Sequence, residues 1–424
     1  MPMKPSTLPA RTPIEVAVPT VRVAPKATVD EVLQAFRVVR ADVANLFALS
    51  GIDPIKTRES ARELNLNRGV TWRLTRIVRE PDAALVVSEV PGRQGIAKFF
   101  QACRERGAPE KAIESATASF EAFEAAVSAC SGDRKTLAML MANRRERTSP
   151  FEQERERRKL FEGASSFWGV QAQVRFVTVF LFPSPDDPKM LDAGHSTGYI
   201  GFRRLGARAW PLSYEAVVKP TGERRQFVKE PLQPDGADEG QLQLLHDFCS
   251  PSHPKIDVVQ MTDMKRFELA PGPLGNEGLT TCVFGSRLRR LYERTPSELG
   301  HAAFNVLLQT PVERVVFDMF AHRDLGFESP AITMLLDRLT YLGSYVQSEF
   351  ERQALPVNEE PAMLPPGPGG VLCPHIPWYP RLLSYICDRI GQPQDAFTGS
   401  RFEMAYPPIS TMLHRRFDLQ PRGS

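Results

Sequence analysis

The stretch KTRESARELNLNRGVTWRLTRIVR, residues 56–79, determines how the N-terminal part of this chain folds. Its first half predicts a short helix over Arg58–Leu64, with Thr57 as N-cap because a threonine hydroxyl can accept an unpaired amide proton of the first turn. Its second half predicts a helix over Arg68–Arg79, which ends where Glu80 precedes a proline. Asn65 tolerates the left-handed conformation that a tight turn between two helices requires.

The second helix of this pair has an apolar side and a basic side. The predicted buried residues recur at helical spacing and are Val70, Leu74, Ile77 and Val78. The candidate DNA-contacting residues are Arg58, Asn67 (also the expected N-cap), Arg68, Thr71, Trp72, Arg73, Arg76 and Arg79. Residues 56–79 hold seven basic and two acidic residues, whereas the whole chain has a formal net charge of +3. Guanidinium groups gathered on one face can neutralise phosphates and reach guanine edges in the major groove.

The turn between the two helices carries a resemblance to a known class of proteins. Ala61, Leu64, Leu66 and Arg68 resemble the A-x-x-L-G-L-x-R core of bacterial helix-turn-helix DNA-binding proteins, with Asn65 at the position where glycine is common. The resemblance covers about 25 residues of the 424. It implies that the second helix lies in the major groove. The alternative is an ordinary amphipathic helical hairpin with a solvated basic face.

Further helices are expected on both sides of this pair, so that residues 28–142 form one helical domain. Thr28 and Glu31 have the spacing of a capping box. The apolar repeats that follow are Val29, Val32, Phe36, Val39, Val43 and Leu46; Ile96, Phe99, Phe100 and Cys103; and Ile113, Ala116, Phe120, Phe123 and Val127. The first repeat has heptad spacing, which suits a two-chain coiled coil, but its short length favours packing inside one bundle. We expect a dimer through this repeat.

The remaining sequence predicts a multidomain chain of α and α+β class. The expected segments are a disordered proline-rich arm (1–27), a charged connector helix (143–165), an α+β domain of unknown role (166–355), a Pro/Gly-rich connector (356–376) and a small C-terminal α+β extension (377–424). Strands are expected at 170–182, 214–218, 256–261, 266–269, 280–284, 402–406 and 412–419. Helices are expected at 242–248, 311–322, 332–345 and 379–390.

Motifs for catalysis or cofactor binding are not found in the sequence. It has no phosphate-binding glycine loop of the G-x-x-x-x-G-K-[ST] or G-x-G-x-x-G type and no G-x-S-x-G nucleophile motif. His322-Arg323-Asp324-Leu325 matches the kinase catalytic loop, but no Asp-Phe-Gly follows it. Cys249 with His253, and Cys373 with His375, each supply only two zinc ligands, and His246 beside Asp247 is a weak general-base pair. We therefore assign no catalytic residue, cofactor or metal.

These patterns favour a bacterial-type DNA-binding protein, with a transcriptional regulator as the expected role. Its expected partners are double-stranded DNA, an unidentified small-molecule effector and a second copy of the chain. The scattered cysteines and the lack of an 18-residue apolar run predict a cytoplasmic protein with no membrane span. The alternative is an enzyme or assembly factor whose N-terminal helices bind a protein partner.

Overall fold

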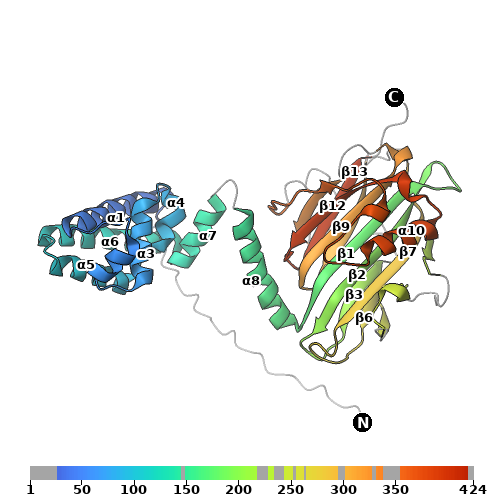
Figure 1. Ribbon diagram of the computed structural model, residues 1–424, viewed down its shortest axis with the longest axis horizontal. Coiled ribbons are helices and arrows are strands. Elements are labelled where there is room, and N and C mark those ends of the chain that lie inside the picture. The colour runs from blue at the N-terminus through green and yellow to red at the C-terminus, as the bar shows by residue number, and fades with distance from the viewer. Residues whose placement is uncertain are drawn as a thin grey trace, which may run out of the picture. The chain divides into compact units, whose positions relative to one another are not determined.

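The chain divides into a helical unit within residues 1–148 and a β-rich unit within residues 149–424 (Figure 1). The computed structural model describes residues 26–144, 149–216, 228–233, 243–251, 255–261, 264–294, 301–326, 331–337 and 354–418. The expected fold class, a helical domain followed by an α+β domain, is confirmed. The arm expected at 1–27 lies outside the described residues up to position 25. No helix in the described ranges is both long and apolar enough to cross a membrane.

The helical unit is a bundle, and the two helices predicted at 58–64 and 68–79 begin and end within one residue of those bounds. Its elements are α1 (Val29–Leu49), α2 (Thr57–Glu63), α3 (Arg68–Arg79), α4 (Ala83–Val86), the 3-10 turn η1 (Val87–Glu89), α5 (Arg93–Glu105), α6 (Glu110–Ser131) and α7 (Arg134–Arg144). The capping box at the start of α1 is formed: Thr28 accepts from the amide of Glu31, whose carboxylate accepts from the amide of Thr28. A local sequence signal therefore sets the start of the first helix.

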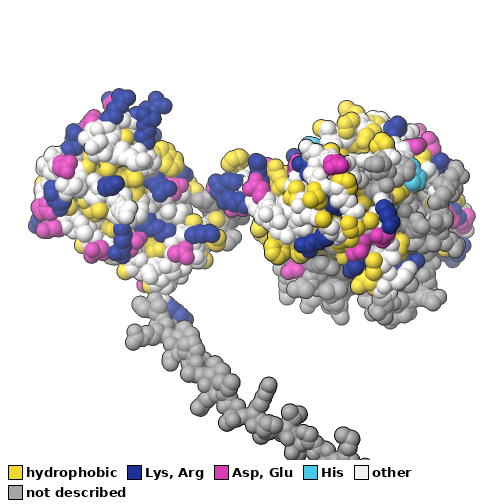
Figure 2. Space-filling model, turned by 90° about the horizontal axis from the view of Figure 1, so that it is seen from below, with side chains coloured by type: hydrophobic (Ala, Val, Ile, Leu, Met, Phe, Trp, Pro, Cys, Tyr) yellow, Lys and Arg dark blue, Asp and Glu magenta, His cyan; other side chains and the backbone are white. Residues whose placement is uncertain are grey.

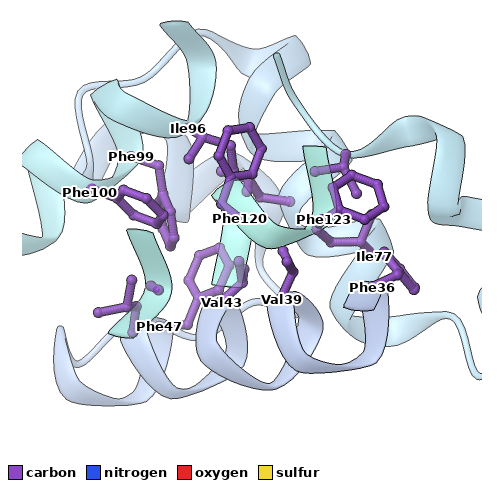
Figure 3. Packing of buried hydrophobic residues seen from close by; sticks show 14 of the residues in the cluster. Phe36, Val39, Val43, Phe47, Ile77, Ile96, Phe99, Phe100, Phe120 and Phe123 are labelled. Atoms are coloured by element: carbon purple, nitrogen blue, oxygen red, sulfur yellow. The ribbon is translucent and has the colours of Figure 1, made fainter. Parts of the chain in front are cut away.

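The core of this unit is built where α1 lies against α6 and α5 (Figure 3). Phe36 of α1 contacts Phe123 of α6 with ring centroids 6.2 Å apart, and Phe47 contacts Phe99 of α5 at 5.1 Å. Val39 is only 1% exposed. The heptad-like repeat of α1 is thus an internal core. The expectation of a dimer through this repeat is wrong, because its side chains are already buried by the same chain.

The charged segment expected as one solvated connector helix, 143–165, is different in the structure. α7 ends at Arg144, residues 145–148 lie outside the described residues, and α8 (Pro150–Trp168) begins after the N-cap Ser149. The α8 side chain of Arg157 is buried, where it donates to the carbonyl of Ala405 and pairs with Glu359. One side of α8 therefore packs on the β-rich unit.

Among its described residues, the β-rich unit contains three sheets and two α-helices, α8 and α10 (Tyr379–Ile390). Its described strands are β1 (Val170–Pro183), β2 (Met190–Arg204), β3 (Trp210–Ala216), β4 (Val228–Pro231), β5 (Ile256–Gln260), β6 (Met264–Leu269), β7 (Thr280–Glu293), β8 (His301–Leu308), β9 (Val312–His322), β10 (Ile332–Asp337), β11 (Ala362–Met363), β12 (Phe397–Ala405) and β13 (Thr411–Asp418). The strand orders are β11-β12-β9-β1-β2-β7-β4, β10-β13-β8 and β3-β6-β5. β1 pairs with β9 in parallel and with β2 antiparallel.

The large sheet is covered on both faces. The α10 helix lies across one face, where its side chains join a cluster with the phenylalanines of β1 (Figure 1). On the other face, Val177, Val179 and Leu181 of β1 pack against strands of the β10-β13-β8 sheet. The residues expected to form a C-terminal extension supply α10, β12 and β13, and so complete these layers.

Several predicted elements of the β-rich unit are wrong. Residues 311–322 and 332–337 form strands β9 and β10 instead of helices, while 338–345 lies outside the described residues. The β-branched valines of β9 favour a strand that is buried on both faces, and such a strand has no polar alternation. Of the helix expected at 242–248, the described residues 243–248 contain the 3-10 turn η2 (His246–Phe248) and no α-helix. Strands β2, β4, β8 and β11 were not predicted.

Candidate nucleic-acid interface

The α2–α3 pair has the backbone turn that a helix-turn-helix requires. Asn65 adopts φ 47°, the left-handed conformation expected from the sequence. Leu64 beside it is 3% exposed, and Leu66 packs partly buried against the same core. Ala61 is buried, as its role under the second helix requires. The turn is therefore held from both sides by apolar contacts.

Hydrogen bonds fix the start of each helix, in one case differently from the prediction. The Asn67 side chain accepts from the amide of Gly69 at 2.8 Å, so the expected cap of α3 is confirmed. The N-cap of α2 is Lys56 and not Thr57, and it makes no side-chain capping bond. The Thr57 hydroxyl instead lies 3.2 Å from that of Thr75, which ties α2 to α3. The predicted cap is thus an inter-helix contact.

The inner side of α3 is locked into the bundle. Leu74 and Ile77 are completely buried, and α3 contacts α1, α2 and α4. Thr71 is also completely buried, and its hydroxyl donates to the carbonyl of Asn67. Thr71 was a candidate DNA contact, and this placement removes it from the accessible surface.

The outer side of α3 carries the other candidate DNA-contacting residues of this helix. Exposed side chains are Arg68, Arg73 and Arg79, together with Trp72 at 49% exposure; Arg58 of α2 and Asn67 of the turn are exposed as well. The structure therefore brings four arginines, one tryptophan and the turn onto accessible surface, with Arg76 partly exposed among them. Elsewhere on the visible face of this unit, Lys and Arg side chains are mixed with Asp and Glu (Figure 2).

Arg76 differs from its neighbours because other residues hold its guanidinium group. Its Nη1 donates to the Glu89 carboxylate at 2.6 Å, and its Cζ lies 5.1 Å from the centre of the Trp72 ring. Burial raises the pKa of Glu89, while the charges of Arg76 and Arg73 oppose that rise. The second oxygen of this carboxylate is buried and has no hydrogen-bond partner among the described residues.

Glu89 is the residue of this surface that sequence reasoning missed. It lies 13 positions after Arg76, beyond the proline that ends α3. No helical spacing relates the two residues. Only the packing of η1 against α3 brings the carboxylate to the arginine.

In the β-rich unit, the described residues that resemble catalytic or metal-binding groups have structural roles. His322 accepts from the amide of Asp324, which makes the kinase-like string a turn at the end of β9. Burial is the main cause that lowers the pKa of His195 to about 3, so this imidazole is neutral at physiological pH. No metal-ligand cluster occurs among the described residues, although His253 lies outside them. A hollow of about 30 Å³ beside Met319 and Phe417 is large enough only for water.

A buried polar network joins α10 to the large sheet. Asp318 of β9 is completely buried, and Arg401 of β12 donates to both of its carboxylate oxygens at 2.8 and 2.7 Å. The Tyr379 hydroxyl donates to the same carboxylate at 2.7 Å and lies 2.8 Å from the Thr178 hydroxyl. Burial raises the Tyr379 pKa well above its usual value. Each polar group has a partner, so the network serves to hold the fold.

Comparison with known proteins found no match to a family model, to a curated sequence or to a solved structure.

Proposed function

We propose that the helical unit binds double-stranded DNA by placing α3 in the major groove. The observation that carries the proposal is the division of α3 into a completely buried side and an outer side rich in arginine. A helix fixed in this way presents its outer side chains at constant positions, which recognition of a DNA surface requires. The left-handed residue Asn65 allows the tight turn between α2 and α3 that a helix-turn-helix needs.

The proposal extends to a transcriptional regulator that acts as a homodimer. One α3 helix makes few contacts, and two copies bound to adjacent half-sites provide the additional affinity. Because the apolar repeat of α1 is buried inside the helical unit, the proposed dimer contact lies on another surface. The β-rich unit is the proposed site of assembly or of effector sensing.

The test is DNA selection followed by binding measurements on three proteins. Replacement of Arg68, Arg73 and Arg76 by alanine should abolish binding to the selected duplex at physiological salt, while circular dichroism stays helical. The matched control replaces Lys98, Arg104 and Lys111, which are exposed on α5 and α6 and carry the same total charge. The control should bind nearly as the parent does. Equal loss in both variants would mean that net charge and not α3 determines binding.

A further inference from the structure

The outer side of α3 has a middle and two edges. At 3.6 residues per turn, Trp72 and Arg76 lie in the middle of the exposed arc, with Arg68 and Arg79 at one edge and Arg73 at the other. A helix seated in the major groove directs its middle toward base edges and its flanks toward the phosphates of the two strands. Position on the helix therefore separates these arginines into two classes.

The first turn of α3 supports this division. Gly69 lies seven positions before Arg76 and so on nearly the same line along the helix. It is exposed and has no side chain to cover the backbone. The middle of the arc is thus open at its N-terminal end, where a recognition helix approaches the bases most closely.

The contacts of Arg76 suit a base-reading side chain. Glu89 accepts from Nη1, and the Cζ of Arg76 lies over the Trp72 ring. Glu89 engages Nη1, while Nε and Nη2 form the other donor edge of the guanidinium group, and two parallel donors of this kind match O6 and N7 of guanine. A side chain that is already ordered loses less conformational entropy when it binds.

The edge arginines have the opposite character. The side chains of Arg68, Arg73 and Arg79 are exposed, and within the described ranges none of them pairs directly with a carboxylate, although the charge of Arg73 acts on Glu89 from a distance. A phosphate can be neutralised from many directions, so a mobile charge is sufficient for it. Glu89 pairs directly with Arg76 at 2.6 Å and acts only from a distance on Arg73, so its negative charge opposes phosphate binding most strongly at Arg76.

We propose that Arg76, positioned by Glu89 and Trp72, reads a guanine, and that Arg68, Arg79 and Arg73 bind the phosphates on either side of it. This assignment rests on the proposed DNA binding and adds which base is recognised and how. Arg76 is the base-contacting residue, and Glu89 acts through it as a positioning residue.

The experiment measures binding of each variant to the selected duplex, and to duplexes in which each G·C pair is replaced in turn, over a series of salt concentrations. Arg76→Ala should lose about 5- to 150-fold of discrimination at one G·C pair, with little change for duplexes already altered there. Arg68→Ala and Arg73→Ala should weaken all duplexes alike and reduce the salt slope by about one unit each.

Glu89→Gln tests the positioning role, because it keeps the shape of the side chain and removes the charge. It should reduce discrimination at the same G·C pair as Arg76→Ala while binding to unrelated duplexes stays equal or becomes tighter. Glu89→Asp should restore part of the preference. The matched control is Glu110→Gln, which removes a carboxylate paired with Arg104 at 2.7 Å on α5 and α6 and should leave the preference unchanged.

The outcomes separate this inference from the proposed function. If the parent binds no duplex, DNA binding itself fails. If the parent binds but Arg76→Ala weakens every duplex equally and lowers the salt slope, Arg76 is a phosphate contact and the inference is overturned. Unchanged discrimination in Glu89→Gln would overturn the positioning role.

Discussion

Asp318 of β9 is a buried charge whose partners come from two other elements. Arg401 neutralises it from β12, while Tyr379 of α10 supplies a further donor. An ion pair of this kind adds little net stability compared with apolar residues of the same shape, because both ions lose their hydration. Loss of one partner alone is much more harmful, since it leaves a charge in a medium that solvates it poorly.

We therefore expect Arg401→Met to destabilise the protein by about 3–5 kcal/mol. The double variant Asp318→Leu with Arg401→Met should recover part of that loss, because both members of the pair are removed, while buried Arg415 loses the opposite charge of Asp318. Urea unfolding of the parent, the two single variants and the double variant measures the free energies. Additive losses in the double variant would show that the two charges stabilise the fold independently.

Elements whose ends depend on neighbouring residues were predictable, and elements that depend on distant partners were not. The cap of α3 by Asn67 and the start of α1 at Thr28 follow from side chains within three positions of the bonds they make. β2 was missed because Gly194 lies within it and lowers its strand propensity. A side chain there would meet Ile390 of α10 at 2.9 Å, so glycine is needed for packing that local sequence does not reveal. Glu89 of the candidate site was missed for the same reason.

Because α1 packs inside the helical unit, a charge placed on its buried side should unfold that unit. Replacing Phe36 by glutamate should unfold the helical unit instead of giving a folded monomer, because Phe36 is completely buried against α6. Val38 of the same helix is 47% exposed, and Val38→Glu is the matched control that should keep the fold. Thermal melts followed by circular dichroism distinguish the two. A cooperative, parent-like melt of Phe36→Glu would contradict this packing.

At the scale of the whole molecule, the two units have separate hydrophobic cores. We expect residues 1–148 expressed alone to fold into a helical protein with a cooperative melt. A control fragment of residues 1–109 lacks α6, which covers the buried face of α1, and it should not fold cooperatively. If 1–148 is unfolded by circular dichroism, the boundary between the units is wrongly placed.

The parallel pairing of β1 with β9 has a consequence for synthesis on the ribosome. Val174 pairs with Arg314, so β1 leaves the exit tunnel about 140 residues before the strand that lies beside it. At roughly 5–20 residues per second, the nascent β1 waits on the order of ten seconds with one edge unprotected. The helical unit depends on nearer contacts and can finish folding during that interval. Slow or stalled translation after residue 183 would therefore expose an aggregation-prone strand, VQAQVRFVTVFLFP, attached to a completed N-terminal unit.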